Sequence, residues 1–230
     1  MKVKIKICGV LDHHIMSTIS DLNVDYVGLV FFEKSPRNIS IEKAKSIVKY
    51  LNNSTKTVAL TVNATDQFLS NIVTNLSPDF IQLHGKESPY RCFDIKKKFK
   101  TKIIKAISAK SSKNLNFEIN KYKFVTDKII IDSPKDHLPG GNGKTFNWKI
   151  LKKEKKKIDW LLAGGINLSN VSKAIKITKT KGLDISSGVE ISKGIKSSQL
   201  IKSFVKKCRN IWIMININAN SLKNLPDLNG

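Results

Sequence analysis

The sequence predicts a single α/β domain, a (β/α)8 TIM barrel with a short C-terminal extension, and three observations support this fold class. Short β-branched runs alternate with polar, helix-compatible stretches along the 230 residues of the chain. A strand followed by a helix, repeated, implies parallel strands joined by crossover helices. Eight such runs within roughly 210 residues match the number of strands and the length of a closed barrel.

The eight runs are the expected strands, and the amphipathic stretches between them are the expected helices. The expected strands are Val3–Cys8, Tyr26–Phe31, Thr57–Val62, Asp79–Leu83, Lys102–Ile107, Lys128–Ile131, Trp160–Ala163 and Gly182–Ile185. The expected helices include Ile41–Tyr50, Thr65–Asn75, Ser88–Lys98, Leu168–Thr178 and Ser198–Lys207. A doubly wound sheet is the alternative, but it usually has fewer strands and a glycine-rich first turn, which this sequence lacks.

The chain shows no internal linker or shift in composition before residue 211. Residues 1–210 are therefore expected to form one barrel domain, and residues 211–230 a C-terminal tail that is packed or disordered. No apolar run reaches about 18 residues, so a membrane span is not expected. The N-terminal segment carries charges through its apolar stretch, which is not typical of a signal peptide.

Cysteine usage points to a cytoplasmic location. Cys8, Cys92 and Cys208 lie in widely separated contexts, without disulfide or metal-ligand spacing. Such a pattern is typical of reducing cytosol. His13 and His14 are adjacent in an expected helix, where neighbouring residues do not share a face, so a metal pair is not expected either.

The strong positive charge suggests a polyanionic partner, but its composition argues against a specific one. The chain has 41 Lys and Arg against 18 Asp and Glu, a formal net charge of +23, and only three of the cations are arginines. Arginine is the preferred residue for phosphate forks and for insertion into nucleic-acid grooves. We interpret the lysines as a solvated coat and expect neither a specific nucleic acid nor a membrane as partner. Nucleic-acid binding is the alternative from charge alone, and affinity across a salt series would test it.

Candidate catalytic residues lie where the expected strands end, because barrel enzymes place their chemistry there. Cys8 ends the first strand; it is either a buried structural cysteine or a base in an environment that lowers the thiol pKa. Arg37 follows the second strand. Its guanidinium either binds a carboxylate or phosphate through two parallel hydrogen bonds, or caps the next helix. His84 follows the fourth strand as an acid, a base or a hydrogen-bonding wall of the site. Asp132 ends the sixth strand and places a carboxyl group at the mouth.

Three glycine-rich segments predict a phosphate site. They follow the sixth, seventh and eighth strands, and glycine lets backbone N–H groups approach an anion closely. Barrel enzymes often hold a phosphate in the loops after strands seven and eight, so a phosphorylated small molecule is the expected substrate. The candidate phosphate-binding residues are Gly141, Asn142, Gly143, Gly164, Gly165, Ser186, Ser187 and Gly188.

These segments together resemble the motif set of the phosphoribosylanthranilate isomerase family of tryptophan biosynthesis. The resemblance runs from about residue 4 to residue 208, with each motif at an expected strand end. The motifs, in chain order, are Lys-Ile-Cys-Gly, Ser-Pro-Arg-Asn-Ile-Ser, Gln-Leu-His-Gly, Gly-Gly-Asn-Gly-Lys-Thr-Phe-Asn-Trp, Leu-Ala-Gly-Gly-Ile and Asp-Ile-Ser-Ser-Gly-Val-Glu.

The resemblance implies an Amadori rearrangement, an aldose-to-ketose isomerisation of N-(5-phosphoribosyl)anthranilate that needs no cofactor and no metal. By motif, Asp132 corresponds to the general acid and Cys8 to the general base. Arg37 corresponds to the residue that holds the anthranilate carboxylate, and Asp184 to one that contacts the sugar or amine. The resemblance leaves a monomer or a homodimer open.

Departures from the family pattern fall outside these positions: Asn38, Asn147, Lys193 and Ser197 replace the residues usual there. Another phosphate-binding barrel, such as indole-glycerol-phosphate synthase or a histidine-pathway isomerase, is the alternative within enzymes. Those families use a lysine/glutamate or two-aspartate apparatus, and the cysteine on the first strand favours the first family.

Overall fold

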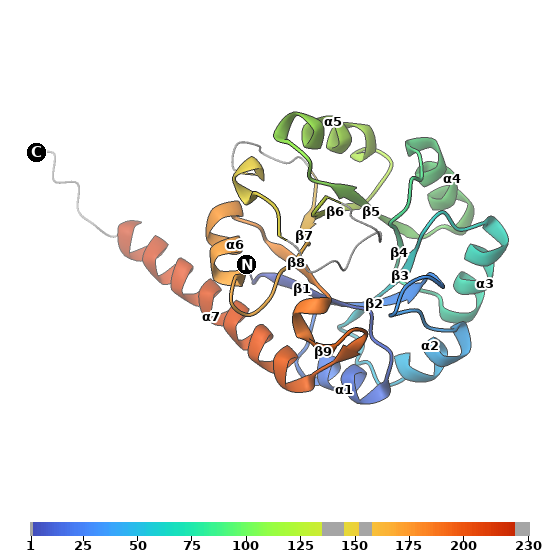
Figure 1. Cartoon of the computed structure of the whole chain (residues 1–230), viewed down its shortest axis with the longest axis horizontal. Helices are drawn as coiled ribbons and strands as arrows, with labels where there is room; N and C mark the ends of the chain where they lie inside the picture. The colour runs from blue at the N-terminus through green and yellow to red at the C-terminus, as the bar shows by residue number, and fades with distance from the viewer. Residues whose placement is uncertain (1, 135–144, 152–157, 224–230) are drawn as a thin grey trace, which may run out of the picture.

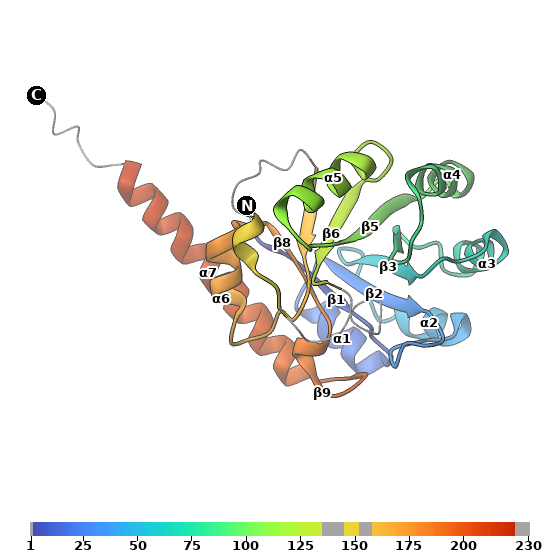
Figure 2. The same ribbon diagram turned by 45° about the horizontal axis from the view of Figure 1, so that its top comes forward.

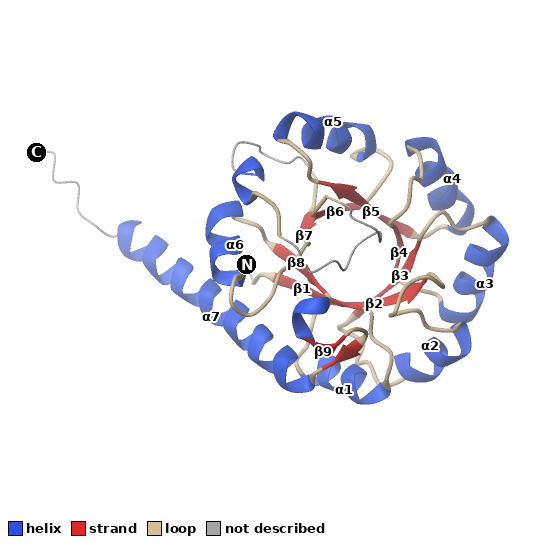
Figure 3. Ribbon diagram, viewed as in Figure 1, coloured by secondary structure: helices blue, strands red, loops and turns tan. Residues whose placement is uncertain are grey.

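The computed structural model describes residues 2–134, 145–151 and 158–223, with side chains through residue 211. Eight parallel strands form a closed ring in chain order, β1 to β8, and the helices surround it (Figures 1 and 3). The predicted fold class is confirmed. The barrel strands are β1 (Lys4–Cys8), β2 (Tyr26–Phe31), β3 (Lys56–Thr61), β4 (Phe80–Leu83), β5 (Lys102–Ser108), β6 (Lys128–Asp132), β7 (Trp160–Leu162) and β8 (Gly182–Ile185).

The helices found in the described residues follow the expected order. They are α1 (His13–Asp21), α2 (Ile41–Val48), α3 (Asp66–Leu76), α4 (Pro89–Phe99), α5 (Ser112–Tyr122), α6 (Val171–Thr178) and α7 (Ser198–Lys223), with short 3-10 helices η1 (Trp148–Leu151) and η2 (Ser187–Val189). The sequence analysis did not single out α5. It also did not foresee the antiparallel pair β9 (Glu190–Ser192) and β10 (Ile195–Lys196).

Side-chain capping fixes where five of these helices begin. The cap side chain accepts a hydrogen bond from the backbone N–H three residues further on, which satisfies one of the free donors at a helix start. The capping residues are Asp12, Ser40, Thr65, Ser88 and Ser111. Each helix therefore starts at a defined distance from the strand before it, which fixes the length of the loops at the mouth.

Successive side chains of a strand point to opposite faces, so each strand contributes to two separate cores. On β6, Ile129 and Ile131 pack outward under the helices in the larger core, whereas Ile130 joins the smaller cluster inside the barrel. Because side chains alternate between the two faces of a strand, Asp132 shares the inward face of Ile130. The same parity places Cys8 and Lys6 inward on β1, since Ile5 and Ile7 lie in the outer core.

Pairing of the first strand with the last closes the barrel. Lys6 stands opposite Asp184 in the register of β1 and β8, and on its other side β1 pairs with β2, where Cys8 stands opposite Gly28. The first and last strands of the barrel therefore meet in the wall that carries Cys8.

The last helix continues past the expected start of the tail at residue 211. α7 is one helix to Lys223, and Ile211 packs against the outer core. The division of the chain at residue 210 stays a prediction. The N-terminal part of α7 packs against α1 and α6, while its C-terminal part extends away from the barrel (Figures 1 and 2). Among the described residues, no helix is both long and apolar enough to cross a membrane.

Candidate active site at the barrel mouth

One pocket lies over the carboxyl ends of the barrel strands. The space within it, counted together with open solvent at its mouth, is about 760 Å³. Its lining includes candidate residues from the first, second, fourth, sixth, seventh and eighth strand ends. These are Cys8, Arg37, His84, Asp132, Gly164, Gly165, Asp184, Ser186 and Ser187.

Cys8 lies at the top of β1 and is almost fully buried, in contact with the apolar side chains of Val30 and Leu60. Burial raises the pKa of its thiol, because the thiolate would lose its hydration, and the positive charge of Lys6 opposes this rise without reversing it. Of the two alternatives for Cys8, the base requires surroundings that lower this pKa, and in the free protein desolvation outweighs the nearby cation. The role of Cys8 as a base stays a prediction.

Asp132 faces His84 across part of the pocket. Its Oδ1 accepts a hydrogen bond of 2.7 Å from the backbone N–H of Ser133, and its Oδ2 lies 3.5 Å from Nε2 of His84. On its other side, His84 Nδ1 lies 2.9 Å from Nε2 of Gln82. His84 therefore lies between Gln82 on one side and the carboxyl group of Asp132 on the other.

Arg37 is held in place by a carboxylate from the other end of the chain. Its Nε and Nη2 donate to the two carboxylate oxygens of Glu190, at 2.7 Å and 2.8 Å, and Lys196 Nζ lies 2.5 Å from Oε1 of the same residue. Desolvation works to raise the pKa of Glu190, but hydrogen bonding to Arg37 and the charge of Lys196 hold it at about 2. Such a two-pronged bond fixes the guanidinium plane and leaves three of its five N–H donors for another anion.

Asp184 is already paired as well. Its Oδ1 accepts a 3.0 Å hydrogen bond from Lys6 Nζ, and both groups lie inside the barrel. Asp184 still lines the pocket, so it faces the buried lysine on one side and the site on the other. The predicted contact between Asp184 and a substrate stays a prediction.

The loops after β7 and β8 lie against each other at the pocket. A side chain on Gly188 would overlap the carbonyl oxygen of Ile166, so only glycine permits this approach. Ser186 Oγ donates a 2.9 Å hydrogen bond to the carbonyl oxygen of Cys8, which ties the eighth loop to the first strand. Of the predicted phosphate-binding residues, Gly141, Asn142 and Gly143 lie outside the described residues.

Sequence reasoning found the residues at the strand ends but missed their charged partners. Lys6, Glu190 and Lys196 form ion pairs with candidate residues or with each other. Lys6 and Glu190 lie inside the quoted motifs, but none of the three was proposed as a site residue. The sequence could have indicated Lys6, because it precedes Cys8 by two positions in the same strand and so shares its face. Lys196 had no such signal, since its approach depends on the β9–β10 turn.

The strands form a closed parallel barrel, and their ends bring a thiol, a carboxyl group, an imidazole and a guanidinium to one pocket. This arrangement defines an enzyme of the (β/α)8-barrel class. The family model described as N-(5'phosphoribosyl)anthranilate (PRA) isomerase matches residues 5–207. The chain belongs to this family.

Individual relatives agree with the family match. The N-(5'-phosphoribosyl)anthranilate isomerase of Bradyrhizobium diazoefficiens is 39% identical over 212 residues, which cover 91% of this chain and 95% of that protein. The protein of the same name from Rhodopseudomonas palustris is 38% identical over 91% of this chain and 99% of its own length. The crystal structure of phosphoribosyl anthranilate isomerase from Thermotoga maritima has a TM-score of 0.82 at 29% identity, over 90% of this chain and 99% of that one.

Proposed function

We propose that the protein isomerises N-(5'-phosphoribosyl)anthranilate to 1-(2-carboxyphenylamino)-1-deoxyribulose 5-phosphate in tryptophan biosynthesis, by general acid–base catalysis without a cofactor. The observation that carries the mechanism is that Cys8 and Asp132 line the same pocket, on strands one and six. Membership of the family supports the reaction. A structure similar to this one, with a TM-score of 0.79 at 29% identity, is described as a complex with the reduced form of that product.

Asp132 is the general acid in this proposal. Its Oδ1 is engaged by the backbone of Ser133, so Oδ2 is the oxygen that carries the proton toward the pocket. Protonation of the furanose ring oxygen lets the bond between that oxygen and carbon 1 break. The lone pair of the amine nitrogen forms the C1=N double bond of a Schiff base, and His84 keeps the carboxyl group aimed at the ring oxygen.

Cys8 is the general base in this proposal. The thiolate takes the proton from carbon 2 of the sugar, and the electron pair of that C–H bond forms a C1=C2 double bond while the iminium nitrogen regains its lone pair. The resulting enolamine tautomerises to the ketone, so no atom is gained or lost overall. The cationic nitrogen is the electron sink, which is why two proton-transfer groups suffice.

Recognition of the substrate is assigned to the remaining residues of the pocket. Arg37, with N–H donors left beyond those bound to Glu190, binds the anthranilate carboxylate. His84 and Asp184 contact the sugar or amine. The phosphate is held by backbone N–H groups and hydroxyls of the glycine-rich loops. The phosphate-binding set comprises Gly141, Asn142, Gly143, Gly164, Gly165, Ser186, Ser187 and Gly188.

The proposal also covers the location, the partners and the oligomeric state of the enzyme. We place it in the cytoplasm, acting on a small phosphorylated molecule without a specific nucleic-acid partner. It works as a monomer or a homodimer; one similar structure is described as monomers generated from a dimeric isomerase of Thermotoga maritima.

A fluorescence assay that follows the loss of phosphoribosylanthranilate tests the proposal. Cys8→Ser and Asp132→Asn should each lower kcat by about 10²- to 10⁴-fold, the contribution of one acid–base group, while circular dichroism shows a folded barrel. Cys92→Ser is the matched control, because Cys92 is equally buried but lies on α4, away from the pocket. Near-parental kcat in both Cys8→Ser and Asp132→Asn would overturn the mechanism.

A further inference from the structure

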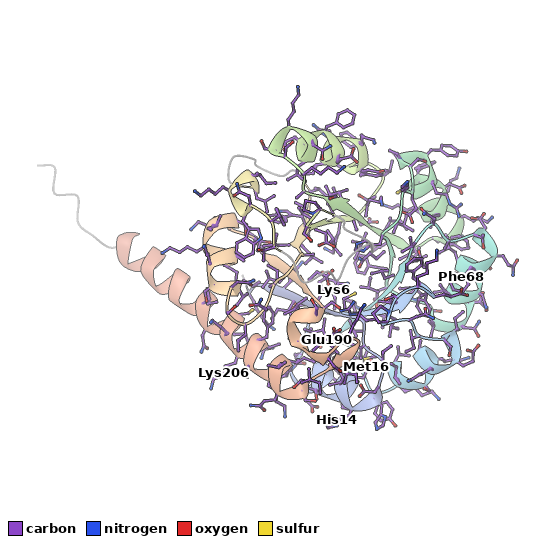
Figure 4. The ribbon with its side chains drawn as sticks, viewed as in Figure 1. Lys6, His14, Met16, Phe68, Glu190 and Lys206 are labelled. Carbon is purple, nitrogen blue, oxygen red and sulfur yellow. The ribbon has the colours of Figure 1, made fainter. Side chains whose placement is uncertain are left out.

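Lys6 is a charged side chain in the barrel interior that the mechanism above does not use. Its side chain is completely buried, and it points inward from β1, two residues before Cys8 (labelled in Figure 4). Lysine is almost never fully buried unless its charge is paired, because an ammonium group loses much hydration energy inside a protein. The position of Lys6 therefore has a cost that its partners must offset.

Two groups partner the ammonium of Lys6. Asp184 accepts its hydrogen bond at 3.0 Å from β8, and the thiol of Cys8, which lies on the same face of β1, is the next group to act on its charge. The neighbouring strand leaves room for this arrangement at Gly28. A Cβ there would stand 2.7 Å from Sγ of Cys8 and 3.0 Å from Nζ of Lys6, so the two atoms share the space that Gly28 leaves open.

We infer that Lys6 is a positioning residue of the reaction: its ammonium, anchored by Asp184, is the countercharge that allows Cys8 to release its proton. This inference rests on the proposed function for the role of Cys8 as a base. Independently of that reaction, the inference states that the charge of buried Lys6 lowers the proton affinity of the neighbouring Cys8 thiol.

The electrostatics of the pair support this assignment. Burial works to lower the pKa of Lys6, but the negative charge of Asp184, followed by that of Cys8, outweighs burial and raises this pKa. Lys6 therefore stays charged through neutral pH. At Cys8, burial is the largest influence and raises the thiol pKa, and Lys6 is the largest influence in the opposite direction.

Other charged groups also face the thiol, from every side of the pocket. Asp184 raises the pKa of Cys8, and Lys196, a more distant cation, lowers it. The titratable or charged side chains around Cys8 are Lys6 on β1, Arg37 after β2, His84 after β4, Asp132 on β6, Asp184 on β8 and Lys196 on β10. Lys6 is the cation of this group that acts most strongly on the thiol.

A purely structural role is the competing explanation, since a buried ion pair can serve packing alone. The two roles differ in one measurable quantity, the fraction of Cys8 present as thiolate at a given pH. A packing role leaves that fraction unchanged in a folded variant, whereas a countercharge role does not. A shift of one pKa unit changes the thiolate fraction, and with it the alkylation rate, about tenfold below the pKa.

The test is alkylation of the free protein by iodoacetamide as a function of pH, resolved by peptide mass spectrometry. In Lys6→Met we expect Cys8 to react at least about tenfold more slowly than in the parent at the same pH. Cys92 and Cys208 serve as internal reporters, because both are buried and become reactive only when the barrel opens. If Lys6→Met leaves Asp184 unpaired and does not fold, Lys6→Met/Asp184→Asn removes both charges. A smaller slowing in the same direction is expected in that double variant, because Asp184 opposes Lys6 at Cys8 and Lys6 acts more strongly than Asp184 does.

Lys105→Met is the matched control. Lys105 is also a buried lysine, with its Nζ 3.0 Å from Oε2 of Glu87, but it does not line the pocket. Its removal should leave the alkylation profile of Cys8 as in the parent. An unchanged Cys8 rate in a folded Lys6 variant, or an equal slowing in Lys105→Met, would overturn the inference. Because no substrate is present, such a result leaves the proposed function standing, whereas parental kcat in Cys8→Ser would contradict the proposed role of Cys8 as the base.

Discussion

Arg37 and Glu190, 153 positions apart in the chain, are joined by two hydrogen bonds of 2.7 Å and 2.8 Å at the barrel mouth. The pair links the loop after β2 to β9, which follows β8. Both side chains are nearly excluded from solvent, and Lys196 completes the cluster from β10. The residue proposed to bind the anthranilate carboxylate is thus itself positioned by a protein carboxylate.

Acid stability should depend on Glu190. Its pKa is about 2 in the folded protein against an ordinary value of 4.5, so it stabilises the fold above pH 4.5 and this contribution is lost as the pH falls toward 2. By linkage, the parent should lose about 2 kcal/mol of unfolding free energy from this group on acidification to about pH 3. Glu190→Gln should be less stable at neutral pH and should lack this component of the acid dependence. Urea unfolding at a series of pH values measures both quantities, and equal acid dependence in the two proteins would contradict the assignment.

Arg37→Lys should impair binding more than chemistry. Lysine keeps the positive charge but cannot form the two-pronged bond to Glu190 or present a planar fork to a second carboxylate. We expect KM for phosphoribosylanthranilate to rise by about 10- to 100-fold, equivalent to roughly 1.4–2.8 kcal/mol, with a much smaller change in kcat. Arg91→Lys is the control, because Arg91 pairs with Asp66 and Asp94 on the outer surface and does not line the pocket. An unchanged KM in Arg37→Lys would remove Arg37 from the binding site.

Gly28→Ala should damage the site although it adds a single methyl group. The new Cβ would stand 2.7 Å from Sγ of Cys8 and 3.1 Å from its Cα, so the thiol or the strand has to move. A shift of about 1 Å at a reacting group costs up to roughly 10²-fold in rate. We therefore expect kcat to fall at least about tenfold while the circular dichroism spectrum is kept. Steady-state kinetics measures the effect, and parental kcat would show that the space beside Cys8 tolerates a side chain.

Truncation after Ile211 should leave the enzyme folded and active. The family match ends at residue 207, and the pocket is lined by residues up to Ser187. We expect parental kcat and KM, and a melting temperature close to that of the full chain. A chain that ends before Phe204 is the contrasting variant: it loses a fully buried aromatic side chain and should not fold stably. Lost activity in the protein truncated after Ile211 would show that the C-terminal part of α7 supports the site.

The strands could be predicted because those of a parallel barrel are buried on both faces and read as continuous apolar runs. On β2 all six residues are buried, and the expected and observed bounds coincide at Tyr26–Phe31. Cys8 and Asp132 could be placed at the mouth because each stands where an apolar run ends, and such a run can be recognised from local sequence alone.

The charged partners could not be predicted in the same way. Nothing near Arg37 indicates that a residue 153 positions away will bind it, because the contact depends on how two loops approach across the mouth. Lys6 is a different case: alternation places it inside, but its charge argues for solvent. Only the closed barrel, with Asp184 opposite Lys6, resolves that conflict.

The pairing of β1 with β8 also has a consequence for how the protein is made. Lys6 meets a residue 178 positions later in the chain, and Lys196 follows later still. While the ribosome still holds the last quarter of the polypeptide, Cys8 has none of its charged neighbours from β8 and β10 and is not enclosed by a ring. Until the barrel closes, its thiol lacks the burial that it has in the folded protein. Barrel closure buries Cys8, so the time between its synthesis and that closure is when the thiol is most open to oxidative damage.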